Sequence, residues 1–296
     1  MKIAVTGASG LIGTPLVTAL RAGGHDVVRL VRGDSAGTPD ARPWDPAHRR
    51  LDPAVLADRD AVVHLAGAGV ADRRWTAAYR RTVLDSRVDG TTAVAQAMAA
   101  ARGPQVLLSA SAVGWYGDTG DRVTDETGPT GEGFLAEVCR RWESATAPAE
   151  RAGVRVAHLR TGIVLSGAGG ALKKQVLAAK AFAGAPLGTG KQWSSWISLH
   201  DEVAAIRHLL TADVAGPVNL VGPAPVTNSE FTRVLNRVVH RPTIPVPVPA
   251  PVLRAVLGGF ADEGVLIGQR LVPAVLQRSG FSFAHPDLET ALRASL

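Results

Sequence analysis

Short apolar runs alternate along the chain with longer segments whose apolar residues recur at helical spacing. The runs are almost continuous in Val, Ile, Leu and Ala, which is typical of parallel strands buried on both faces. Predicted strands cover residues 2–6, 26–31, 61–66, 105–109, 154–159 and 218–221, and predicted helices cover 11–22, two patterns within 76–101, 133–151 and 201–211. This alternation predicts an α/β fold built on a doubly wound parallel sheet.

The C-terminal part of the chain has a different pattern. Residues 217–251 contain eight prolines, which favours an extended connector, and short helices are predicted at 251–258 and 266–278. We therefore expect a small C-terminal lobe packed on the sheet domain. The predicted division assigns residues 1–165 and 196–222 to the sheet domain, and residues 166–195 and 223–296 to the smaller lobe.

Composition narrows the class of protein. The 296 residues are 46% hydrophobic and 20% charged, so the chain can bury a large core without disulfides. The net charge of +6 comes from 32 basic residues, which are scattered among acids, so we expect no nucleic acid as partner and at most a preference for an anionic small molecule. The chain has no apolar run long enough to predict a membrane span. Its single cysteine, Cys139, fits a cytoplasmic location. The oligomeric state has no signature in the sequence.

A glycine-rich turn carries the strongest functional signal. The first predicted strand runs directly into Gly7-Ala-Ser-Gly-Leu-Ile-Gly13, and a helix follows. The first glycine suits the tight turn, the second lets backbone N–H groups approach a pyrophosphate, and the third lets the helix lie close to the strand. This setting predicts a Rossmann-type dinucleotide site. Its predicted cofactor-binding residues are Gly7, Ser9, Gly10, Leu11, Ile12 and Gly13.

The end of the second predicted strand indicates which dinucleotide binds. NAD sites usually place an acid there, whereas this chain has Val31 followed by Arg32. A guanidinium suits a 2′-phosphate, so NADP(H) is favoured over NAD(H). Asp34 lies close by and keeps NAD as the alternative.

Several motifs resemble those of extended short-chain dehydrogenases of the nucleotide-sugar epimerase/dehydratase type. They are Asp60-Ala-Val-Val-His-Leu-Ala-Gly67, Ser109-Ala-Ser111 with Tyr116-Gly117, Arg160-Thr-Gly162 and Trp196-Ile-Ser-Leu-His-Asp201. More narrowly, residues 111–117, 134–143 and 188–196 resemble the atypical "epimerase family protein" subgroup, whose C-terminal domain of unknown function residues 242–292 also resemble. The resemblance implies that Leu65, Ala66, Gly67 and Ser109 line the cofactor.

The chain departs from this family at the residues that carry its chemistry. The family uses Tyr-x-x-x-Lys as acid–base and ribose-holding residues, whereas alignment on Glu143 places Leu135 and Cys139 at those positions. We therefore predict Ser111 and Tyr116 as replacement catalytic residues. The alternative for Tyr116 is a phenol packed under its loop.

Other candidates have simpler interpretations. Cys139 shares an apolar helix face, Glu137 and Arg141 are spaced as a surface pair, and His64 and Asp201 are interpreted as a structural histidine and a helix cap. No histidine has metal-ligand spacing, so we predict no metal. A flexible loop offers three candidate substrate contacts, which would otherwise be core residues: Lys191, Trp193 and Trp196.

Together these features predict an NADP(H)-binding oxidoreductase or epimerase-like enzyme acting on a small-molecule substrate that the sequence does not identify. A non-catalytic regulatory or interaction protein that senses the cofactor is the alternative.

Overall fold

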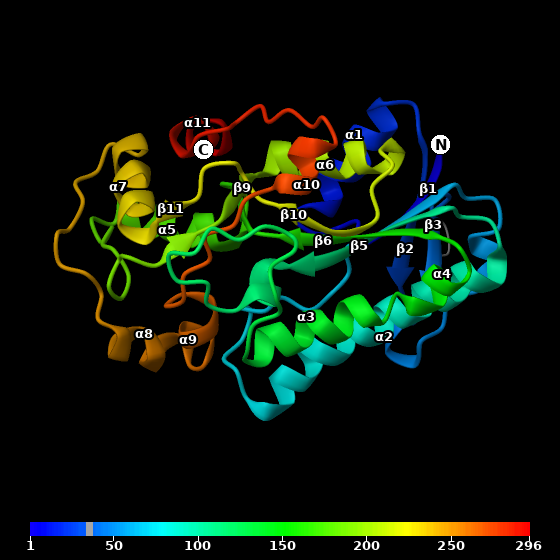
Figure 1. The fold of residues 1–296 in the computed structure, drawn as a ribbon, viewed down its shortest axis with the longest axis horizontal. Coiled ribbons are helices and arrows are strands. Elements are labelled where there is room, and N and C mark those ends of the chain that lie inside the picture. The colour runs from blue at the N-terminus through cyan, green and yellow to red at the C-terminus, as the bar shows by residue number, and fades with distance from the viewer. Residues whose placement is uncertain (34–37) are drawn as a thin grey trace.

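A seven-stranded parallel sheet forms the centre of the computed structural model, which describes residues 1–33 and 38–296 (Figure 1). Its strand order is β10-β6-β5-β4-β1-β2-β3. From β1 the chain adds β2 and β3 on one side, and then adds β4, β5, β6 and β10 on the other side of β1. This order confirms the predicted doubly wound, Rossmann-type fold. The strands are β1 (Lys2–Thr6), β2 (Asp26–Arg32), β3 (Ala41–Trp44), β4 (Ala61–His64), β5 (Val106–Ala112), β6 (Arg155–Thr161) and β10 (Gly216–Leu220).

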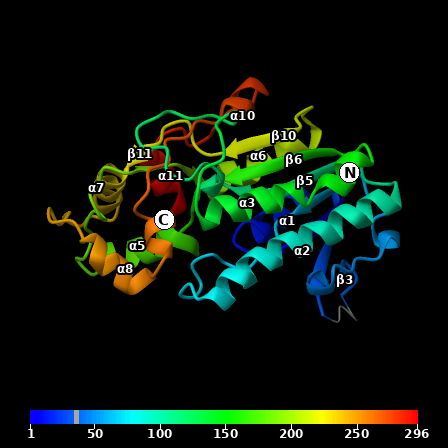
Figure 2. The ribbon, with the colours of Figure 1, turned by 60° about the horizontal axis from the view of Figure 1, so that its bottom comes forward.

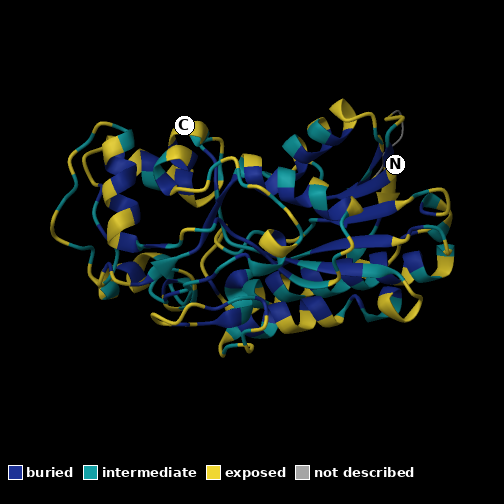
Figure 3. Ribbon diagram, turned by 45° about the horizontal axis from the view of Figure 1, so that its top comes forward, coloured by how far each residue is buried: buried dark blue, intermediate teal, exposed yellow. Residues whose placement is uncertain are grey.

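Two helical layers cover the sheet, because its strands are apolar on both faces (Figures 2 and 3). One layer holds α1 (Gly13–Ala22) and α6 (Leu199–Thr211), and the other holds α2 (Ala77–Ala101), α3 (Phe134–Ser144) and α4 (Ala147–Arg151). The two patterns predicted within residues 76–101 form one helix, since Gly90 packs against the rings of His64 and Trp44 instead of ending it. No helix among the described residues is long and apolar enough to cross a membrane.

A smaller lobe extends from the carboxyl end of β6. Two short strand pairs build it, β7 (Ile163–Leu165) with β9 (Trp196–Ser198) and β8 (Trp193–Ser194) with β11 (Val226–Thr227). Its helices are α5 (Gly170–Lys180), α7 (Asn228–Val238), α8 (Ala250–Leu257), α9 (Phe260–Gly264) and α11 (Leu288–Ser295).

The C-terminal segment does not stay within this lobe. Its helix α10 (Ala274–Arg278) packs on β10, and Leu276 is fully buried in the core of the main sheet. The predicted helix over 266–278 is wrong in its first half, because Pro273 cannot donate a helical hydrogen bond and disfavours helix in the residue before it. Residues before α10 instead run extended, and Leu271 bridges to Thr124.

Candidate functional site

The glycine-rich turn has the close packing that its sequence predicts. Gly7 has a φ of +65°, which favours glycine. A Cβ at Gly13 would lie 2.1 Å from the carbonyl oxygen of Gly7, so only glycine lets α1 start this close to β1. No described side chain caps the first turn of α1, so its first N–H groups lack side-chain partners, although Thr14 N–H donates to the Gly10 carbonyl oxygen. This cradle fits the pyrophosphate of a dinucleotide.

A cavity of about 1500 Å³ extends from this turn along the carboxyl ends of β1, β2 and β4. Most of the predicted cofactor residues line it, namely Gly7, Ser9, Gly10, Arg32, Leu65, Ala66 and Gly67. The other four do not. Gly13 acts through close packing, Ser109 is buried, and Leu11 and Ile12 lie at the start of α1, where Leu11 packs against residues 169–170.

A buried pair fixes the loop that follows β4. The Thr6 hydroxyl accepts hydrogen bonds from the N–H groups of Leu65 and Ala66, and it lies 2.8 Å from Nδ1 of His64. Burial lowers the pKa of His64 to about 4, so the ring is neutral at physiological pH. Its contacts are those of a structural histidine.

Arginines surround the cavity at the end of β2. Arg29 donates two hydrogen bonds to Asp40, and this contact holds the pKa of the Asp40 carboxyl well below its usual range. Arg32 and Arg50 also line the cavity. Asp34, the residue that left NAD open, lies outside the described residues.

Helix α3 carries apolar groups where the family carries acid–base residues. Cys139 is 3% exposed, its thiol lies 3.5 Å from the Ala112 carbonyl oxygen, and burial raises its pKa to about 12. Glu137 forms ion pairs with Arg140 and Arg141 on the solvent side. Neither face of this helix offers a group that exchanges protons near neutral pH beside Leu135.

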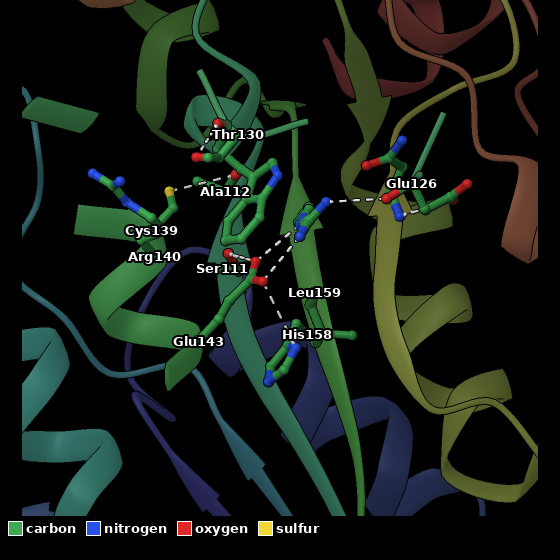
Figure 4. A network of polar contacts seen from close by, with 12 residues as sticks. Ser111, Ala112, Glu126, Thr130, Cys139, Arg140, Glu143, His158 and Leu159 are labelled. Atoms are coloured by element: carbon green, nitrogen blue, oxygen red, sulfur yellow. Dashed lines mark hydrogen bonds and ion pairs between the residues drawn. The ribbon is translucent and has the colours of Figure 1, made fainter. Parts of the chain in front are cut away.

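The predicted catalytic Ser111 belongs to a buried polar network (Figure 4). Its hydroxyl donates to Oε1 of Glu143 at 2.7 Å. Arg160 donates to both oxygens of the same carboxylate, at 2.9 and 3.0 Å, and His158 stands 3.8 Å from it. Ser111, Glu143 and Arg160 are each less than 10% exposed.

Tyr116 belongs to the same network. Its hydroxyl donates to Oδ1 of Asn219 at 2.7 Å and accepts from Nη1 of Arg160 at 3.0 Å. Burial raises its pKa to about 12, against the effect of the Arg160 charge. The structure thus joins the two predicted catalytic residues through Arg160 and Glu143. Their catalytic roles stay predictions, and proton donation by Tyr116 requires its bond to Asn219 to break.

Glu126 connects this network to the C-terminal segment. Its Oε1 accepts from the N–H groups of Asn219 and Val275, both at 3.1 Å, and burial raises its pKa. Asn219 also donates to the Val272 carbonyl oxygen. Three chain segments are therefore held together at the end of β10: the loop at Glu126, β10 itself and residues 272–275.

A second cavity, of about 350 Å³, lies beyond the end of β5 and beside the start of α3. Tyr116 and Leu135 line it together with Glu263 from α9. Oε2 of Glu263 accepts the N–H of Leu135 at 2.8 Å. The C-terminal part of the chain thus reaches the position of the family's tyrosine, which the sequence alone does not reveal.

The predicted substrate loop is divided between surface and core. Lys191 is exposed, and the indole N–H of Trp193 donates to Asp121 while Arg270 stacks on the ring. Trp196 is 1% exposed and packs in the core of the smaller lobe. We therefore correct the assignment of Trp196 as a substrate contact, because its ring is enclosed by apolar neighbours.

Sequence spacing also missed a partly buried cluster of two histidines and an aspartate. His200, Asp201 and His285 bring their ligand atoms within 4.8 Å of one another, although 84 residues separate Asp201 from His285. Both Asp201 oxygens accept backbone N–H groups, from Ala284 and His285. Ser198 caps α6 instead of Asp201, whose carboxylate fastens the C-terminal segment to that helix.

Comparison with known proteins identifies the family of this chain. Residues 3–222 match the NAD dependent epimerase/dehydratase family, and residues 248–295 match a domain of unknown function, DUF1731. The chain belongs to the NAD-dependent epimerase/dehydratase family. The family match covers the whole sheet, including every strand end that lines the larger cavity.

Individual members of this family resemble the chain over its full length. "Epimerase family protein MT2273" of Mycobacterium tuberculosis is 48% identical over 98% of this chain and 96% of its own. A crystal structure of human epimerase family protein SDR39U1 with NADPH matches with a TM-score of 0.91, at 30% identity, covering 100% of this chain and 99% of that one. UDP-glucose 4-epimerase of Thermotoga maritima, solved with UDP-glucose, shares the fold at a TM-score of 0.80 and 18% identity, over 100% and 97% of the two chains.

Proposed function

We propose that the protein is an NADP(H)-dependent oxidoreductase acting on a small molecule. The observation that carries this proposal is the cavity that joins the glycine-rich turn to Arg32, since it offers a pyrophosphate cradle and a guanidinium for a 2′-phosphate. The NADPH in the crystal structure of human SDR39U1 supports the same choice. Bound here, the cofactor would supply hydride to a carbonyl carbon or accept it from an alcohol.

The second cavity is the proposed substrate site. It lies at the same edge of the sheet as the cofactor cavity, one strand further on, and Leu135 and Glu263 form part of its wall. Its charged side chains are Asp118, Glu132 and Glu263 against Arg122 alone. This lining suits a polar substrate that is uncharged or cationic better than the anionic one that the sequence favours.

A cofactor-sensing protein without catalysis is the second candidate. It is favoured by α3, which has neither phenol nor amine, and by the Tyr116 hydroxyl, which is hydrogen-bonded both as donor and as acceptor. If the protein is an enzyme, proton transfer is therefore slow.

Calorimetry followed by a turnover assay tests both candidates. We expect NADPH to bind more tightly than NADH, and a panel of aldehydes and ketones to include a slow substrate whose reduction consumes NADPH. The sensor would be favoured if NADPH binds tightly, no carbonyl compound is reduced with it, and no matching alcohol is oxidised with NADP⁺. Failure to bind either cofactor would contradict both candidates. A cytoplasmic location stays a prediction.

A further inference from the structure

Arg87 of α2 is a buried cation that the contacts described so far do not explain. Its side chain is 8% exposed, and no carboxylate among the described residues pairs with it. Nη1 donates to the carbonyl oxygens of Ala68 and Val83, at 2.9 and 3.0 Å, whereas Nε and Nη2 have no acceptor within the described part of the chain. Buried charges are normally paired, and arginine does not lose its proton. Neither nitrogen is among the fully enclosed polar atoms of the described residues, so an additional acceptor can reach them.

The position of Arg87 indicates where that acceptor binds. Gly67 and Ala68 line the cofactor cavity, and a Cβ placed on Gly67 would lie 3.5 Å from the guanidinium carbon of Arg87. On its other side, the guanidinium stacks on Trp142 of α3, 4.8 Å from the ring centre. Burial lowers the pKa of Arg87. Arg87 therefore lies between the wall of the cofactor cavity and α3, the helix that carries the lysine in the family.

We propose that Arg87 supplies from α2 the positive charge that the family's lysine supplies from α3, and that it binds oxygen atoms of the nicotinamide half of NADP(H). The inference rests on the proposed cofactor binding. A guanidinium has five N–H donors, and the two backbone carbonyls occupy only one of its nitrogens. The remaining donors suit the ribose hydroxyls or the phosphate oxygens of that half.

Replacement of Arg87 by methionine tests this role without knowledge of the substrate. Arg87→Met keeps an apolar stem on Trp142, and it leaves no carboxylate of the described residues without its partner. Calorimetry would compare NADPH, 2′-phospho-ADP-ribose, which lacks the nicotinamide ring, and 2′,5′-ADP, which contains only the adenine half. We expect the first two to bind about tenfold to hundredfold more weakly and 2′,5′-ADP to bind as in the parent. Arg87→Lys, which retains the charge, should lose less NADPH affinity than Arg87→Met.

Arg32→Met is the matched control, because it should weaken all three ligands through their shared 2′-phosphate. An Arg87→Met protein that binds NADPH as tightly as the parent would overturn the inference, as would an equal loss for all three ligands. A loss confined to NADPH would support it and would assign the contact to the carboxamide of the nicotinamide ring. If the parent itself binds neither NADPH nor 2′,5′-ADP, the proposed function fails, which is a different result. Thermal unfolding of each variant confirms that it is folded.

Discussion

The two halves of the sheet's carboxyl edge are built on different principles. At β1, β2 and β4 the backbone and small residues leave an open cavity of about 1500 Å³. At β5, β6 and β10 the buried side chains of Ser111, Arg160 and Asn219 belong to one hydrogen-bonded network, beside a smaller cavity of about 350 Å³. The first half thus keeps an open cavity, whereas the second half holds its polar side chains in a buried network. Variants in the first half should therefore change cofactor affinity, and variants in the second half should change stability.

Breaking the buried ion pair should have the largest effect. Glu143→Ala leaves the Arg160 guanidinium buried without its carboxylate, and we expect a loss of about 3–5 kcal/mol in the free energy of unfolding, measured with urea. Glu137→Ala on the same helix is the control, because its pairs are exposed and should contribute less than about 1 kcal/mol. Similar losses in the two variants would show that the network does not stabilise this half.

The half of the sheet edge at β5, β6 and β10 should also make stability depend on pH. Glu202 is fully buried, accepts from Thr161 at the end of β6, and burial raises its pKa from 4.5 to about 8. Between these values the unfolded chain has released this proton and the folded protein keeps it, so stability falls as pH rises through the window. Relative to Glu202→Gln, which has no such proton, the parent should lose on the order of a few kcal/mol between pH 5 and pH 8. Parallel pH profiles of the two proteins would contradict this prediction.

Substitutions in the half at β1, β2 and β4 should instead change cofactor affinity. Arg32→Asp should remove a charge-assisted contact worth about 1.5–3 kcal/mol, weaken NADPH roughly tenfold to hundredfold and reverse the preference over NADH. Arg42→Asp makes the same charge change on β3, where the guanidinium bonds backbone carbonyls of Pro39 and Ala41, and should leave the preference intact. Calorimetry that finds equal NADPH and NADH affinity in the parent would refute the role of Arg32.

Tyr116→Phe distinguishes a network residue from a proton donor. Removing the hydroxyl leaves Asn219 and Arg160 each without one buried partner, so we expect stability to fall by about 1–3 kcal/mol while NADPH affinity is unchanged. If Tyr116 serves only the network, turnover per folded molecule should change by a few-fold at most. A loss of roughly 10²-fold in a fully folded variant would support proton donation by Tyr116.

Cys139→Ala should have the smallest effect. The thiol is a small buried group beside the Ala112 carbonyl, so its removal should cost ~1 kcal/mol of stability and alter any activity by a few-fold at most. Complete loss of turnover with intact NADPH binding would show that the thiol takes part in chemistry.

The contrast between the halves also explains what the sequence could predict. The glycine-rich turn is a local motif, so its strand, turn and helix follow from the continuous segment of residues 2–22. The sequence did not predict the strand β3, because Pro43 interrupts its strand pattern. The proline is tolerated there because β3 lies at the edge of the sheet. In contrast, 103 residues separate Tyr116 from Asn219 and 128 separate Leu135 from Glu263.

A weak signal for the buried network was nevertheless present. Arg160 ends an apolar strand and Glu143 follows Trp142 on an apolar helix face, and charges in such positions normally need partners. Neither residue identifies its partner through periodicity, because Glu143 of α3 and Arg160 of β6 meet only after the helix has packed on the sheet. The same holds for His200 and His285.

The placement of Leu276 in the main core affects the order in which the chain can fold during synthesis. Val218 and Leu220 of β10 share that core with Leu276, and Phe281 and Phe283 pack against it. From residue 222 to residue 283 the ribosome must add 61 residues, which takes roughly 3–12 s at bacterial and eukaryotic elongation rates. Throughout this interval the sheet is complete in strands but lacks its last apolar cover along β10, an edge strand able to pair with another chain. In the nascent protein the apolar side chains of β10 therefore stay without this cover until residues 276–283 have been added.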